Sequence, residues 1–199
     1  MTSIKRLITI IGISGALTGF PLTLEAITSN EYAPSKTMAA SSTWDVRQAA
    51  DALFQDIQSD AQQARNHAAT LQSFQYSPDI TWKLHGSQLN QLKTEVNDMV
   101  EKVCRLEKIR PVLAPWQQET TDRIASKLPL MAVDVTDAIY YVNTHQHELM
   151  NLTYWRYADN LCSEAADVTQ SAGNAVKYAN VLGEYDKLRA VLGVATKAS

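Results

Sequence analysis

Histidine is the residue type in this sequence whose spacing suggests a specific chemical site. His67, His85 and His145 each lie near a core-facing position when the apolar spacing of a predicted helix is extended. In an antiparallel bundle of such helices, the three imidazoles would meet at one end. Three histidine ligands suit zinc or copper. One hypothesis is therefore a metal site at His67, His85 and His145, with His147 or Glu148 nearby as a further ligand.

The competing interpretation gives each histidine a separate structural role. His67 lies between small residues, His85 stands beside Gly86 in the first turns of a helix, and His145 is close to a helix end. Histidines in such places commonly bond to backbone groups or water. We favour this interpretation and keep the metal- or cofactor-binding bundle as the alternative.

Aromatic side chains gather around the last predicted helix-to-helix turn. Tyr140, Tyr154, Trp155 and Tyr157 lie within eighteen residues of one another. Tyrosine and tryptophan are favoured in binding sites, so a protein or a small hydrophobic ligand is one partner that this end could take. Large rings also close the end of a bundle whose last helix is rich in alanine, and we favour this packing role.

Enzyme signatures are lacking in the sequence. It contains no Cys-x-x-Cys-His for covalent haem, no His-Glu-x-x-His, no Gly-x-Ser-x-Gly and no glycine-rich phosphate loop. We therefore predict a non-enzymatic protein that acts as a binding, adaptor or structural component.

The N-terminus predicts export. Lys5 and Arg6 precede a mostly apolar stretch, and Ala26 ends a plausible cleavage site, which together are typical of a secretory signal peptide over residues 1–26. Residues 27–43 contain few large apolar side chains and are expected to form a flexible lead-in. We expect a periplasmic or extracellular protein with no stable membrane insertion after cleavage.

The net charge of the chain argues against one class of partner, the nucleic acids. The full chain has a formal net charge of −3. Cleavage would remove two basic residues and one acidic residue, leaving the mature chain one unit more negative. A mildly acidic chain without clustered lysine and arginine argues against a nucleic-acid partner.

The remaining residues, 44–199, predict one all-α domain. Helices are expected over 44–75, with Thr43 as N-cap, and over 80–109, with Asp79 as N-cap. The second helix has apolar residues at alternating steps of three and four, the spacing of a coiled-coil seam: Leu89, Leu92, Val96, Met99, Val103 and Leu106.

Two further helices are expected over 115–149 and 152–192. The apolar phase of the third helix continues across Pro129, which predicts a kinked but continuous helix. The alternative is a chain reversal, because the residue before a proline is disfavoured in helical conformation. Matching helix lengths and short turns favour an antiparallel up-down-up-down four-helix bundle.

The two cysteines present a conflict. Exported proteins usually pair such thiols, but in a four-helix bundle Cys104 and Cys162 would lie on diagonally opposed helices at different levels. Their separation along the axis would be more than about 20 Å, whereas a disulfide needs Cα atoms within about 7 Å. An internal disulfide between Cys104 and Cys162 is possible if the chain reverses at Pro129, but we do not favour it.

Overall fold

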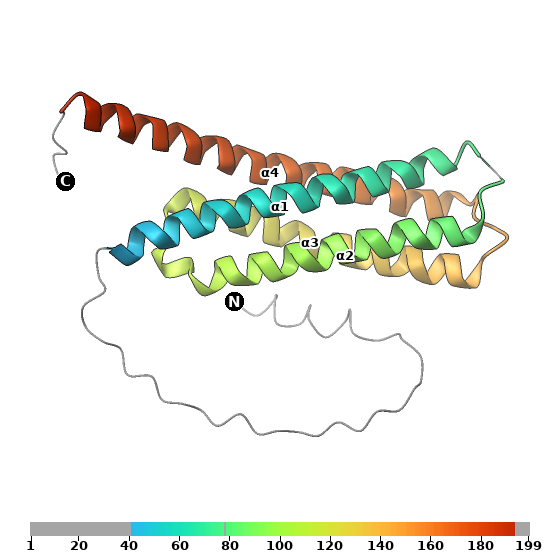
Figure 1. The fold of residues 1–199 in the computed structure, drawn as a ribbon. Helices are drawn as coiled ribbons and strands as arrows, with labels where there is room; N and C mark the ends of the chain where they lie inside the picture. Colours follow the sequence, from blue (N-terminus) through green and yellow to red (C-terminus); the bar gives the residue numbers. More distant parts are fainter. Residues whose placement is uncertain (1–40, 78, 194–199) are drawn as a thin grey trace, which may run out of the picture.

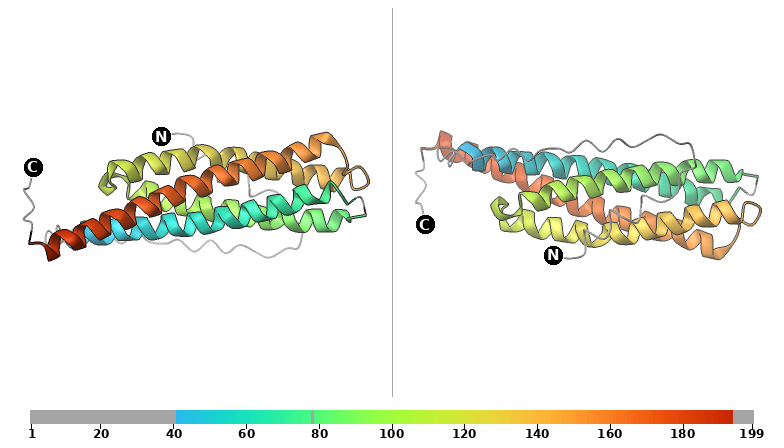
Figure 2. Two further views of the ribbon diagram at one scale, coloured as in Figure 1. Left: turned by 90° about the horizontal axis from the view of Figure 1, so that it is seen from above. Right: turned by 90° about the horizontal axis from the view of Figure 1, so that it is seen from below.

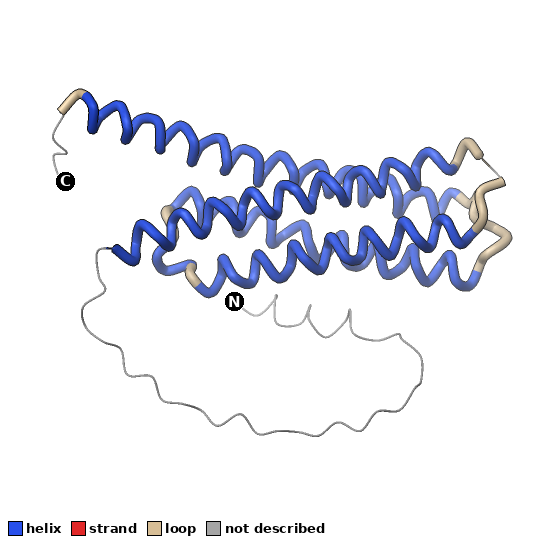
Figure 3. Tube along the Cα trace, in the orientation of Figure 1, coloured by secondary structure: helices blue, strands red, loops and turns tan. Residues whose placement is uncertain are grey.

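Four long helices make up most of the part of the chain that the structure describes (Figures 1 and 3). A computed structural model describes residues 41–77 and 79–193. The predicted signal peptide, and the predicted lead-in up to residue 40, lie outside this part. The helices are α1 (Ser41–Phe74), α2 (Trp82–Lys108), α3 (Pro115–Thr144) and α4 (Leu152–Val191), and a short 3-10 helix, Arg110–Val112, joins α2 to α3. The prediction of an all-helical domain is confirmed.

The helices pack side by side around a shared interior. α1 packs on α2 and α4, and α3 also packs on α2 and α4. Figure 1 shows that the α1–α2 and α3–α4 connections lie at the same end of the molecule, and that the α2–α3 connection lies at the opposite end. We call these the two-loop end (residues 75–81 and 145–151) and the one-loop end (residues 109–114).

The buried side chains follow the predicted periodicity. All six seam residues predicted for α2 are buried. The seam of α3 is also buried on both sides of Pro129, which lies inside one continuous helix. The prediction that α3 continues through Pro129 is therefore confirmed, and the chain does not reverse there. On α1 the interior contains Phe54, Ala61 and Ala68, among other residues.

Three helix boundaries differ from the prediction. α1 begins at Ser41, so Thr43, the predicted N-cap, and the last three residues of the predicted lead-in lie within the helix. α2 begins at Trp82 rather than beside Asp79, and its N-cap residue, Thr81, makes no side-chain capping bond. α3 ends at Thr144 rather than near Leu149. The Asn151 side chain accepts a hydrogen bond from the backbone N–H of Thr153 at 2.8 Å and so caps α4. The residues between Thr144 and Asn151 form the connection in which the chain reverses direction before α4 begins.

α4 is longer than the bundle that it joins. Its buried positions end at Ala175, although the helix continues to Val191. Figures 1 and 2 show its C-terminal part extending past the beginning of α3. Within the bundle, a Cβ at Gly173 would lie 2.9 Å from Nε2 of Gln58, so glycine allows α4 to approach α1 closely. Among the described helices, none is both long enough and apolar enough to cross a membrane.

Candidate functional site

The three candidate metal ligands have separate partners. Nδ1 of His67 lies 2.9 Å from Oε1 of Gln88, and Nδ1 of His85 lies 2.9 Å from the Tyr154 hydroxyl. His145 is the exposed C-cap residue of α3. Within residues 41–77 and 79–193, no group of three or more His, Cys, Asp or Glu side chains is placed to hold a metal ion. The structure therefore does not assemble His67, His85 and His145 into the metal site of the sequence hypothesis.

Two of these histidines belong to a series of stacked rings at the two-loop end. The His145 ring stacks on Tyr141 with a centroid distance of 4.4 Å, Tyr141 stacks on Tyr154 at 5.6 Å, and Tyr154 contacts His85 at 5.4 Å. The His85 ring then meets Phe74 edge-on at 4.9 Å. Such contacts stabilise packing beyond the area they bury, so these histidines fill and close the end of the bundle.

The predicted aromatic binding end is mostly interior. Tyr154 and Trp155 are buried, with exposed fractions of 1% and 7%. Tyr157 is half-buried and packs against the core, whereas Tyr140 is exposed. Burial takes the first two rings out of reach of a partner, which agrees with the packing role favoured above.

Burial changes the acid–base behaviour of this end. It lowers the pKa of His85 from 6.5 to about 4, because the charged imidazolium is poorly solvated there. It also raises the pKa of the Tyr154 hydroxyl. Both groups are therefore neutral at pH 7, as suits a hydrogen-bonded pair in an apolar interior.

Cys104 and Cys162 are free thiols, each half-buried. They lie on α2 and α4, and each of these helices packs chiefly on α1 and α3. The disulfide that the sequence left possible is not formed.

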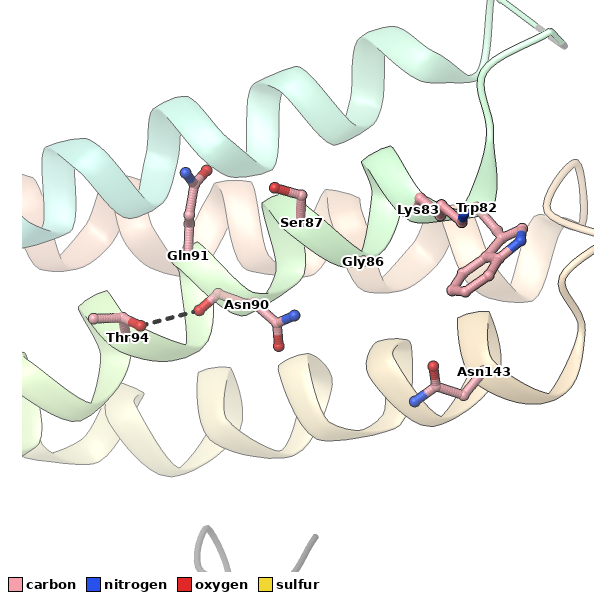
Figure 4. A pocket seen from close by; sticks show the side chains of 8 residues that line it. All are labelled: Trp82, Lys83, Gly86, Ser87, Asn90, Gln91, Thr94 and Asn143. Carbon is pink, nitrogen blue, oxygen red and sulfur yellow. Dashed lines mark hydrogen bonds between the residues drawn. The ribbon is translucent and has the colours of Figure 1, made fainter. Parts of the chain in front are cut away.

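A polar groove lies between α2 and α3 (Figure 4). Its volume is about 550 Å³. We call it the α2–α3 groove and define it by its lining residues: Trp82, Lys83, Gly86, Ser87, Asn90, Gln91, Thr94 and Asn143.

The groove contains side chains that can donate and accept hydrogen bonds. Asn90 on α2 and Asn143 on α3 extend from facing helices into the space between them (Figure 4). Only Thr94 among the polar lining residues makes a side-chain hydrogen bond in the described structure, to the backbone oxygen of Asn90 at 3.1 Å. The amides of Asn90, Gln91 and Asn143 are thus free to meet a ligand, and each offers two donors and an acceptor.

Trp82 and Gly86 shape the groove. The Trp82 ring packs partly against the core, and Nζ of Lys83 lies 5.8 Å from its centroid. Gly86 has no side chain, so the backbone of α2 is uncovered at this point of the groove. A Cβ at this position would meet no atom within 4 Å. Packing therefore does not require glycine at this position, and the bare backbone allows a ligand to approach closely.

Sequence reasoning centred on histidine and aromatic residues and missed this groove. The usable signal was a polar stripe on α2, in which Lys83, Ser87, Asn90 and Thr94 recur at steps of four, three and four. Its partner residue Asn143 comes from another helix, so the juxtaposition depends on the tertiary fold. Comparisons with protein-family models, curated proteins and solved structures gave no significant match.

Proposed function

We propose that the chain is an exported, non-enzymatic binding protein that recognises a neutral, hydroxyl-rich ligand, a glycan strand, in the α2–α3 groove. In this proposal residues 1–26 are removed as a signal peptide, and an antiparallel up-down-up-down bundle supplies the rigid support. The observation that most directly supports the proposal is the groove itself, in which amide side chains without hydrogen-bond partners in the described structure lie beside the indole ring of Trp82.

The charge of the groove favours a neutral ligand. Lys83 is the one charged residue among the eight that line it, and no carboxylate lines it. Neighbouring hydroxyls of a sugar can each donate and accept, which matches the amides of Asn90, Gln91 and Asn143. A metal ion or a phosphate would need carboxylates or clustered cations instead.

Trp82 supplies the apolar part of such a site. A sugar ring has one face of C–H groups, and an indole offers a flat apolar surface with a polar edge. The ring stands at one end of the groove, while the amide of Asn90 lies farther along α2 and that of Asn143 extends from α3 (Figure 4). A ligand longer than one sugar would therefore contact both.

The test is binding of neutral linear oligosaccharides of glucose and of N-acetylglucosamine, measured by calorimetry on the purified chain. We expect saturable binding that weakens at least tenfold in Asn90→Ala and in Asn143→Ala. Each substitution removes hydrogen bonds that a bound ligand would leave unreplaced.

Gln63→Ala is the matched control, because it removes an exposed amide from α1, away from the groove. It should leave the affinity unchanged. Absence of binding by either oligosaccharide series, or equal loss in Gln63→Ala, would contradict the proposed function.

A further inference from the structure

The C-terminal part of α4 exposes an unusual amount of apolar surface. We call residues 178–192 the α4 overhang. Its large apolar residues are all at least 38% exposed: Tyr178, Val181, Leu182, Tyr185, Leu188, Val191 and Leu192. Contiguous apolar patches on a soluble protein commonly mark an interaction surface.

The exposed residues follow the spacing of a helix–helix interface. Tyr178, Val181, Tyr185, Leu188 and Leu192 succeed one another at steps of three, four, three and four. This is the seam of a coiled coil, in which apolar side chains of one helix fit between those of another. The geometry suits a helical partner rather than an extended peptide or a small molecule.

This seam begins at the edge of α4 that borders α3 and faces outward from the bundle. Asp167, which forms an ion pair with Lys127 of α3 at 2.7 Å, precedes Tyr185 by eighteen residues, about five helical turns. Both residues therefore lie on one side of α4. At the base of the overhang, the Tyr178 ring meets Trp116 in the first turn of α3 with a centroid distance of 5.0 Å. Beyond that contact α3 has ended, and the seam residues of α4 are exposed among the residues that the structure describes.

Among the described residues, no helix packs on the exposed seam beyond the beginning of α3, and the seam can take one further helix alongside the α4 overhang. The overhang of a second copy, rotated by a two-fold axis, can supply this helix and keeps the two bundles at opposite ends. A parallel copy would instead place its own bundle where α3 already packs.

Charge along the overhang also fits an antiparallel second copy. The acidic residues Glu184 and Asp186 come first, and the basic residues Lys187 and Arg189 follow. Antiparallel overlap centred between residues 186 and 187 brings the acidic half of each copy to the level of the basic half of the other.

We propose that the α4 overhang is a self-association surface through which two copies of this chain join end to end, as an antiparallel pair of α4 helices. The overlap is only about three turns long, so we expect a reversible dimer whose population rises with protein concentration.

The first experiment is sedimentation equilibrium of the purified chain, with reductant present because Cys104 and Cys162 are free thiols. We expect the mass to double as concentration rises, and Leu188→Glu to lower the association constant at least tenfold. Ala190→Glu is the matched control, because it adds the same charge two residues away on a different side of the helix, and it should dimerise as the wild type does.

Small-angle X-ray scattering tests the arrangement. An end-to-end dimer should raise the maximum dimension by about half or more, whereas a side-by-side dimer would double the mass with little change in length. The proposal is overturned by a chain that stays monomeric up to millimolar concentration, by a side-by-side dimer, or by equal sensitivity to Leu188→Glu and Ala190→Glu. Binding of oligosaccharide in the groove is measured independently, so either proposal can fail alone.

Discussion

His85 is the residue at which the chemistry of this chain departs most from that of a solvated side chain. It is 2% exposed, it is hydrogen-bonded to Tyr154, and its pKa is lowered from 6.5 to about 4 by burial. An imidazole with this environment is suited to packing as a neutral ring. It is poorly suited to carrying positive charge at physiological pH.

The lowered pKa of His85 predicts a loss of stability in acid. Between pH 6.5 and 4 the unfolded chain binds a proton at this histidine and the folded chain does not. Its contribution is therefore complete above pH 6.5 and is lost as the pH falls towards 4, by about 3 kcal/mol in the free energy of unfolding. Urea unfolding of the wild type and of His85→Leu, compared at each pH across this range, measures the loss as a change in the difference between the two. Substitution of the exposed His145 by alanine is the control, and its difference from the wild type should not change in this way.

At the scale of elements, the interface between α3 and α4 contains Glu164, a carboxyl group whose pKa is raised by burial, whereas burial lowers the pKa of His85. Burial, and secondarily the negative charge of Asp134, raises the pKa of Glu164 from 4.5 to about 7. Its Oε2 atom is buried and has no hydrogen-bond partner in the described structure. The folded state therefore favours the protonated acid, and its contribution to stability is present below pH 4.5 and is lost as the pH rises through 7.

We accordingly expect Glu164→Gln to stabilise the protein at pH 8 by about 1–3 kcal/mol, and to have little effect at pH 4. Denaturant unfolding at the two pH values tests this. Equal effects at both pH values would show that the substitution changes packing rather than ionisation. Glu119→Gln on the exposed side of α3 is the control, and no pH-dependent difference is expected there.

Gly86 offers a test that separates helix stability from recognition in the groove. Because alanine fits there without contact, Gly86→Ala should raise the free energy of unfolding by about 0.5–1 kcal/mol. The added methyl group lies on the floor of the groove, so oligosaccharide affinity should fall. Gly183→Ala makes the same change in the α4 overhang, also in open space, and should leave the affinity unaltered.

The sequence predicts a helix well where the pattern that specifies the helix lies within that helix itself. The six-residue seam of α2 is a local pattern, and all its members are buried. The termination of α3 at Thr144 was not predicted, because Val142 and Leu149 keep the apolar phase across it and both are buried. Leu149 reaches the interior from the connection, where no helical spacing applies.

Sites depend on where helices face one another, which local patterns do not determine. His85 was predicted to lie near a core-facing position and Tyr154 to belong to the aromatic cluster, but the two are separated by 69 positions and were not predicted as a bonded pair. Asn90 and Asn143 likewise become neighbours of one groove only through the packing of α2 on α3. The alternative of a histidine triad depended on the same packing, which gives His67 a separate partner and places His85 and His145 in one series of rings.

At the scale of the whole molecule, His85 and Glu164 oppose one another. As pH falls from 6.5 to 4.5, stability is lost at His85 and gained at Glu164, because their pKa values are shifted in opposite directions relative to the unfolded chain. The wild-type profile over this interval should consequently be flatter than that of either His85→Leu or Glu164→Gln. The two single-variant slopes should have opposite signs.

The molecule also divides into a cooperative bundle and an overhang that contributes little to it. The buried positions of α4 end at Ala175, and Tyr178 is the residue of the overhang whose ring packs on Trp116. Removing residues 184–199 therefore takes away no buried side chain within the described range. The midpoint of thermal unfolding, measured at low protein concentration, should change by no more than about 4 °C. A truncation that begins at Ala172 removes core residues of α4 and should abolish the cooperative transition. If the shorter truncation unfolds the protein as completely as the longer one does, the overhang is part of the folding unit, and the division of α4 at residue 178 is wrong.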